Sequence, residues 1–175
     1  MTNYFIVPGL GNSGTEHWQT YFETKGNNFI RINQQEWDAP NCNSWVETID
    51  AALVNVDLST VVLIGHSLGC TTIVKWALQY KKKIKGALLV APSDVDVPGY
   101  NFPTTGFSPI PSEKISFKTI VVASTNDEWV TLERATYFAN NWGSELINIG
   151  EAGHINTAAG FGKWDEGLTL LAKFD

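Results

Sequence analysis

The chain contains the stretch Val61-Val62-Leu63-Ile64-Gly65-His66-Ser67-Leu68-Gly69, and this stretch decides the fold. Its first four residues form a continuous apolar run, which is typical of a strand buried on both faces. After Ser67 the apolar residues recur with helical spacing, so we predict a strand that turns sharply into a helix. The turn carries a G-x-S-x-G motif, whose flanking glycines leave room for neighbouring chain while the Ser67 hydroxyl is exposed above the sheet edge. The alternative is that Ser67 is an ordinary helix N-cap.

The alternation of strand and helix continues on both sides of this stretch. We predict strands at residues 4–7, 29–32, 61–64, 87–90, 120–123 and 146–149, and helices that begin at Thr15 or later, near Ser44, at Ser67, after Thr131 and at Trp164. Strands that alternate with helices favour a mainly parallel sheet covered by helices on both faces. The prediction is therefore one domain, residues 1–175, with a three-layer α/β/α sandwich and no large lid domain.

Charge and composition exclude several classes of partner. The formal net charge is −6, so neither nucleic acid nor an anionic membrane surface is an expected partner. No apolar run approaches the length of a membrane span, and no signal peptide pattern is visible at the start. Cys42 and Cys70 form no metal-ligand pattern, so we predict no metal site. We expect a cytoplasmic protein.

A serine hydroxyl becomes a nucleophile only when a base lies within hydrogen-bond reach. The chain has three histidines: His17, His66 and His154. His66 lies inside the turn beside Ser67, and His17 comes early in the chain. His154 follows the last predicted strand, at the carboxyl edge of the sheet where ligand sites form in α/β proteins. We therefore predict His154 as the base.

A third residue, an acid, is needed to orient the histidine. In hydrolases with this kind of turn the order along the chain is serine, acid, histidine. Asp127 lies between the other two and directly after a predicted strand, so it is the predicted acid. The competing carboxylates are Asp94, Asp96 and Glu128.

Two backbone amides are expected to complete the site. The negative oxygen that forms during acyl transfer needs preorganised donors. We predict the amide of Leu68, which follows the serine, and that of Leu10 in the loop after the first strand. The same loop, residues 9–14, also fits G-x-G-x-x-G, a dinucleotide fingerprint. Pro8 precedes its first glycine and the next helix begins beyond the glycines, which counts against that alternative.

Residues 92–117 interrupt the alternation of strand and helix. They contain five prolines, so we predict a long irregular loop that borders the site and forms a functional or mobile segment. Phe102 and Phe107 in this loop are predicted to line an apolar acyl site. Anchoring of the loop is the alternative role for both rings.

The sequence as a whole resembles a family of small serine hydrolases of the α/β-hydrolase superfamily, the YdeN and retinoblastoma-binding protein nine type. The matching segments are residues 7–11, His17-Trp18, Trp37, Pro40, Trp45, the turn at 65–69, Ala91-Pro92, 124–127, 142–144 and 152–156. The resemblance implies a compact hydrolase fold and a triad of Ser67, Asp127 and His154. His17, near the oxyanion loop, is a candidate for substrate contact or for packing.

The expected activity is hydrolysis of a small-molecule ester, or a related acyl bond, through a covalent acyl-enzyme and without a cofactor. A thioesterase, amidase or peptidase would use the same residues. The alternative to an enzyme is a protein-interaction module that keeps the hydrolase fold but has little turnover.

Overall fold

A six-stranded, entirely parallel sheet forms the centre of the computed structural model, which describes residues 1–175. Its order is β2-β1-β3-β4-β5-β6. The strands are β1 (Asn3–Val7), β2 (Phe29–Arg31), β3 (Val61–His66), β4 (Gly86–Val90), β5 (Thr119–Ala123) and β6 (Glu145–Asn148). The order reverses direction between β1 and β3, so the loops after these two strands meet at one edge of the sheet.

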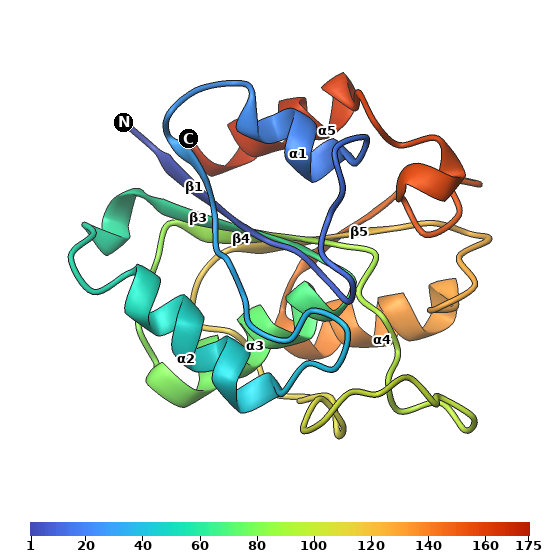
Figure 1. Cartoon of the computed structure of the whole chain (residues 1–175). Helices are drawn as coiled ribbons and strands as arrows, with labels where there is room; N and C mark the ends of the chain where they lie inside the picture. Colours follow the sequence, from blue (N-terminus) through green and yellow to red (C-terminus); the bar gives the residue numbers. More distant parts are fainter.

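Helices cover both faces of the sheet (Figure 1). One face carries α1 (Trp18–Glu23) and α5 (Asp165–Leu170), which continues as the 3₁₀ turn Leu171–Phe174. The other carries α2 (Cys42–Ala52), α3 (Leu68–Tyr80) and α4 (Leu132–Trp142). Two further 3₁₀ turns span Leu58–Thr60 and Thr157–Ala159. The predicted three-layer α/β/α sandwich is confirmed.

The sheet separates two hydrophobic clusters. Successive side chains of a strand point to opposite faces. Val61 and Leu63 therefore join the cluster under α2, α3 and α4, whereas Val62 and Ile64 join the cluster under α1 and α5. All six residues of β3 are buried, which explains the continuous apolar run in the sequence.

Several element boundaries differ from the prediction by one or two residues; β6, for example, spans Glu145–Asn148 rather than 146–149. Helix α2 begins at Cys42 rather than near Ser44, because the Asn41 side chain caps it by accepting hydrogen bonds from the amides of Asn43 and Ser44. Strand β2 ends at Arg31, one residue early.

The irregular loop at residues 92–117 is present, without helix or strand. Its first part is tied down by carboxylates. Asp94 forms an ion pair with Arg134 of α4, with 2.6 Å between Oδ2 and Nε. Asp96 Oδ2 accepts the amide of Ile110 at 3.0 Å, which fastens two points of the loop together.

The start of α3 leaves no room for a side chain at Gly69. A Cβ atom there would lie 2.1 Å from the carbonyl oxygen of Val7 in β1. We predict that Gly69→Ala lowers the free energy of unfolding by about 3 kcal/mol or more, since the contact is with backbone and cannot be relieved by a rotamer change. Urea denaturation measures this. Gly14→Ala is the control, because nothing lies within 4 Å of a Cβ there. Equal stabilities for the two variants would contradict this packing.

Candidate active site

Ser67 occupies a strained turn between β3 and α3. Its backbone has φ 55° and ψ −122°, in the left-handed half of conformational space that side chains other than glycine avoid. The Ser67 amide donates to the Val90 carbonyl at 3.1 Å, and the Ser67 carbonyl accepts from Cys70 at 3.0 Å. The Ser67 hydroxyl makes no capping hydrogen bond with α3. The alternative of an ordinary N-cap is therefore wrong.

The loop after β1 passes directly against this turn. A Cβ atom at Gly9 would lie 2.8 Å from Ser67 Cβ and 3.2 Å from the Leu68 nitrogen. The next residue, Leu10, has an amide that donates no hydrogen bond within the protein. Leu68 is the first residue of α3, where an amide has no acceptor within the helix. Two residues with free amides, Leu10 and Leu68, thus line the same cavity as Ser67.

Arg31 fixes the shape of the glycine-rich loop. Its Nη1 donates to Asn12 Oδ1 and to the Ser13 carbonyl, both at 2.7 Å. Helix α1 begins at Trp18, beyond the glycines. The loop therefore faces the Ser67 turn and does not open a helix, unlike a dinucleotide fingerprint.

Asp127 and His154 meet at the carboxyl edge of the sheet, from the loops after β5 and β6. His154 Nδ1 lies 2.9 Å from Asp127 Oδ2 and 3.0 Å from Oδ1. Both side chains are buried. The Trp129 amide donates to Asp127 Oδ1 at 2.8 Å, which fixes the carboxylate. Of the carboxylates weighed from the sequence, Asp127 is the one in contact with His154, while Asp94 is paired with Arg134.

Asn126 ties the two loops together. Its Oδ1 accepts from the Gly153 amide at 2.7 Å and from the Ser124 hydroxyl at 2.8 Å. The Ser124 hydroxyl oxygen in turn accepts from the Ala152 amide at 2.9 Å. Because Asn126 precedes Asp127 and Gly153 precedes His154, these bonds set the distance between the acid and the imidazole.

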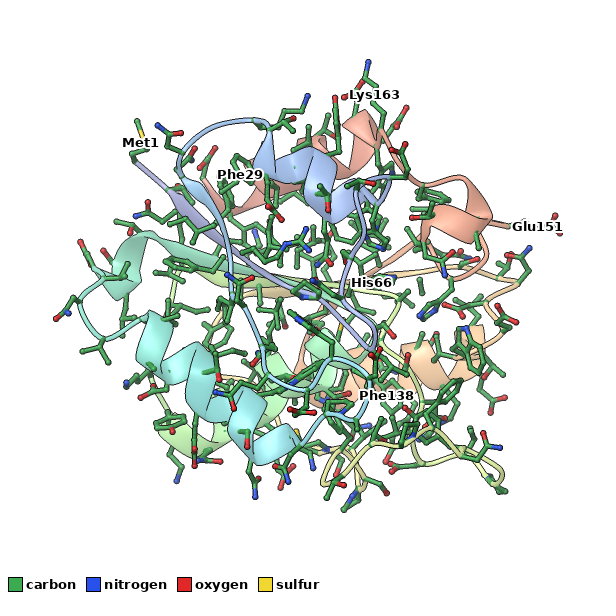
Figure 2. All side chains as sticks on the ribbon, in the orientation of Figure 1. Met1, Phe29, His66, Phe138, Glu151 and Lys163 are labelled. Carbon is green, nitrogen blue, oxygen red and sulfur yellow. The ribbon has the colours of Figure 1, made fainter.

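The three histidines form a row. The His66 and His154 ring centroids are 5.0 Å apart, and those of His66 and His17 are 4.8 Å apart. His66, labelled near the centre of Figure 2, is buried, and its Nε2 donates to the His154 carbonyl at 3.0 Å. Burial lowers the pKa of His66 well below its ordinary value. His66 therefore stays neutral and supports the backbone of His154.

His17 is a neutral imidazole in one defined tautomer. Burial, with the charges of Arg31 and His154 as lesser causes, lowers the pKa of His17 to about 4. Its Nδ1 accepts the Gln19 amide at 3.2 Å, so the proton is on Nε2. His17 caps α1 and also lines the cavity above Ser67, while its contact with a substrate stays a prediction.

A cavity of about 330 Å³ opens above Ser67. Its lining residues are Leu10, Asn12, Gly14, His17, His66, Ser67, Leu68, Ser93, Tyr100, Phe102, Trp129, His154, Asn156, Thr157 and Ala158. Three aromatic rings form one wall, with centroids 5.3 Å apart for Tyr100 and Phe102 and 5.1 Å apart for Phe102 and Trp129. The lining contains no Asp, Glu, Lys or Arg.

Phe107 does not line this cavity, so that prediction is wrong. Gly106 turns the loop back with φ 77°, and the Phe107 ring is buried against Trp45 at 5.7 Å between centroids. Phe107 therefore anchors the loop in the core, whereas Phe102 lies on the cavity wall as predicted.

Sequence reasoning missed Ser93. Its Oγ lies 2.6 Å from Ser67 Oγ, and no other side chain hydrogen-bonds to that oxygen. The available signal was its place just after β4, the strand next to the one that carries the Ser67 turn. Nothing else in the sequence distinguishes a catalytic serine in a loop from any other loop serine.

No group of three or more His, Cys, Asp or Glu side chains is placed to hold a metal ion. None of the helices combines the length and the apolar character that a membrane crossing requires.

The fold and this edge of the sheet define an α/β protein with a serine at a strained strand-to-helix turn. The serine hydrolase family matches residues 4–173, and the chain belongs to this family. A search of curated protein sequences found no match. The chain is an enzyme, a hydrolase.

Solved structures agree with this assignment. A YdeN-like hydrolase from Pectobacterium atrosepticum is 38% identical with a TM-score of 0.88, over 99% of this chain and 90% of that one. The ydeN gene product of B. subtilis is 19% identical with a TM-score of 0.83, over 99% and 98%. Carboxylesterase CesB from Bacillus subtilis, 13% identical with a TM-score of 0.70 over 99% and 83%, shares the fold.

The buried neutral His17 predicts a stability that depends on pH. The unfolded chain takes up a proton on this imidazole below about pH 6.5, whereas the folded chain resists until about pH 4. The free energy of unfolding should therefore fall as the pH is lowered through this window, with His17 contributing about 2 kcal/mol between pH 7 and pH 4.5.

Urea denaturation of the wild type and of His17→Asn at both pH values isolates this contribution. Asparagine keeps an acceptor for the α1 cap but does not titrate. The variant should lose less stability on acidification. Identical losses in the two proteins would show that His17 is not held neutral by the fold.

Proposed function

We propose that the chain hydrolyses a small, uncharged ester, or a related acyl compound, through an acyl-enzyme on Ser67. The observation that carries this proposal is the His154–Asp127 pair at the wall of the cavity that also contains Ser67. A nucleophile, a base and an orienting acid at the carboxyl ends of β3, β6 and β5 are what such a reaction needs.

His154 is the proposed base. Its Nδ1–H donates to Asp127, which leaves Nε2 as the free lone pair of the neutral imidazole. This nitrogen takes the Ser67 proton as the hydroxyl attacks the substrate carbonyl, and later returns it to the leaving group. Asp127 keeps the imidazole in this tautomer and stabilises the imidazolium that forms.

The amides of Leu10 and Leu68 are the proposed oxyanion donors. Leu10 has no acceptor in the protein, and Leu68 begins α3, where the helix dipole favours negative charge. Both belong to the backbone around the close contact between Gly9 and Ser67, which supports a hole that is formed before substrate binds. A second molecule, water, then attacks the acyl-enzyme with His154 as base.

The cavity indicates the class of substrate. Its lining contains no Asp, Glu, Lys or Arg to pair with a charged substrate group, and desolvating a carboxylate or an ammonium group there without such a pair would be costly. The aromatic wall of Tyr100, Phe102 and Trp129 favours an apolar part of the substrate. Because carboxylesterase CesB and the RedJ thioesterase of Streptomyces coelicolor share the fold, oxygen esters and thioesters are both within this class.

A fluorophosphonate probe tests the nucleophile. The folded wild type should gain the mass of one phosphonyl group at Ser67, whereas Ser67→Ala and the urea-unfolded wild type should gain none. Peptide mass spectrometry locates the adduct. A wild type that stays unlabelled, or labelling that survives in Ser67→Ala, would refute Ser67 as nucleophile. Labelling without turnover on esters, thioesters and amides would favour the interaction module.

Asp127→Asn tests the acid. The amide cannot stabilise the imidazolium and favours the wrong tautomer, so kcat should fall by roughly 10²- to 10⁴-fold with little change in thermal unfolding. The neighbouring Glu128→Gln, at an exposed side chain, is the matched control and should keep wild-type kcat. Full activity of Asp127→Asn on an ester substrate would move the acid to another carboxylate.

A further inference from the structure

Ser67 has a hydroxyl partner that a serine–histidine–aspartate mechanism does not use. Its Oγ lies 2.6 Å from Ser93 Oγ, and both residues line the same cavity. No hydrogen bond joins Ser67 Oγ to His154 in this structure, so Ser93 is the side chain in direct contact with the attacking oxygen.

The position of Ser93 is fixed from both sides. Ahead of it, the Ala91 amide donates to Val122 in β5 at 2.8 Å. Behind it, the Asp94 amide donates to the Trp129 carbonyl at 2.9 Å, and the buried Asp94 carboxylate is paired with Arg134. Ser93 is therefore held at this place by a strand and by a loop with a buried ion pair.

The direction of the hydrogen bond during reaction follows from the proton that Ser67 must lose. Asp127 occupies the Nδ1–H of His154, so the Ser67 proton moves to His154 Nε2. Once Ser67 donates to His154, its Oγ can only accept from Ser93. The Ser93 hydroxyl is then the donor, at the oxygen that gains negative charge.

We propose that Ser93 is a further catalytic residue, whose hydroxyl stabilises the charge that develops on Ser67 Oγ. This role rests on the proposed function. In acylation the Oγ–carbon bond forms as the Ser67 proton moves to His154, which then protonates the leaving group as its bond to carbon breaks. In deacylation water adds to the same carbon and gives its proton to His154. The carbon–Oγ bond then breaks and His154 returns the proton to Oγ. Ser93 keeps its own proton in both steps.

Ser93→Ala tests this role by the rate of fluorophosphonate labelling and by ester turnover. Loss of a hydrogen bond to a developing charge should lower the second-order labelling rate and kcat by about 10- to 100-fold, with KM nearly unchanged. Ser93→Thr, which keeps the hydroxyl, should recover most of the rate. If Ser93→Ala does not fold, Ser93→Cys replaces it, since a thiol is a weak donor.

The chain offers a matched control for the loss of a hydroxyl pair. Thr119 Oγ1 and Ser144 Oγ are also 2.6 Å apart, in β5 and just ahead of β6. Ser144→Ala removes the same kind of bond and should leave labelling and turnover at the wild-type rate. A comparable loss in this variant would assign the Ser93 effect to general destabilisation and overturn the proposal.

Two results separate this role from the proposed function. If the wild type labels at Ser67 and folded Ser93→Ala labels equally fast or faster, Ser93 merely holds the hydroxyl in an unreactive position and the catalytic role is wrong. If the wild type does not label, the proposed function itself fails and the role of Ser93 fails with it.

Discussion

The contact between backbone and backbone at the β3–α3 turn is the constraint on which the site depends. The Val7 carbonyl would lie 2.1 Å from a Cβ atom at Gly69, and Ser67 Cβ would lie 2.8 Å from a Cβ atom at Gly9. Through this contact the loop after β1 packs against the turn that holds Ser67 at φ 55°. This backbone conformation costs about 1–3 kcal/mol. The burial of β3 before the turn and of α3 after it stabilises this strained conformation of Ser67.

The remaining groups of the site come from loops, and each loop is fastened to the next by hydrogen bonds. Asn126 joins the loop after β5 to the loop after β6, and His66 joins the Ser67 turn to His154. Asp94 and Arg134 fasten the loop after β4 to α4. Since parallel strands end at a common edge, these short bonds are sufficient to bring residues that lie far apart in sequence to one cavity.

The sequence predicted the features that depend on local pattern. The apolar run of β3, the glycines around Ser67 and the alternation of strand and helix are local, and they specify the sheet and the turn. Asp127 and His154 were placed by chain order and strand ends, and they lie in contact. Leu10 is predicted as a donor from its position after β1, and this role stays a prediction.

Features that depend on tertiary packing were not predictable in the same way. Phe102 and Phe107 lie in the same irregular loop, and nothing in the local sequence distinguishes their roles. In the structure the chain turns at Gly106, Phe107 packs against Trp45, and Phe102 lies on the cavity wall. Ser93 is a candidate because its Oγ contacts Ser67 Oγ, and Ser67 lies 26 residues earlier in the chain. Helix α2 begins earlier than predicted because Asn41, and not Ser44, caps its first turn.

A crystal structure of the chain after reaction with a phosphonate tests the central claim most directly, because the adduct imitates the tetrahedral intermediate. The account predicts phosphorus bonded to Ser67 Oγ and the phosphonyl oxygen within hydrogen-bond distance of the Leu10 and Leu68 amides, with His154 Nε2 near Oγ. An adduct on another residue, or a phosphonyl oxygen pointing away from both amides, would contradict it.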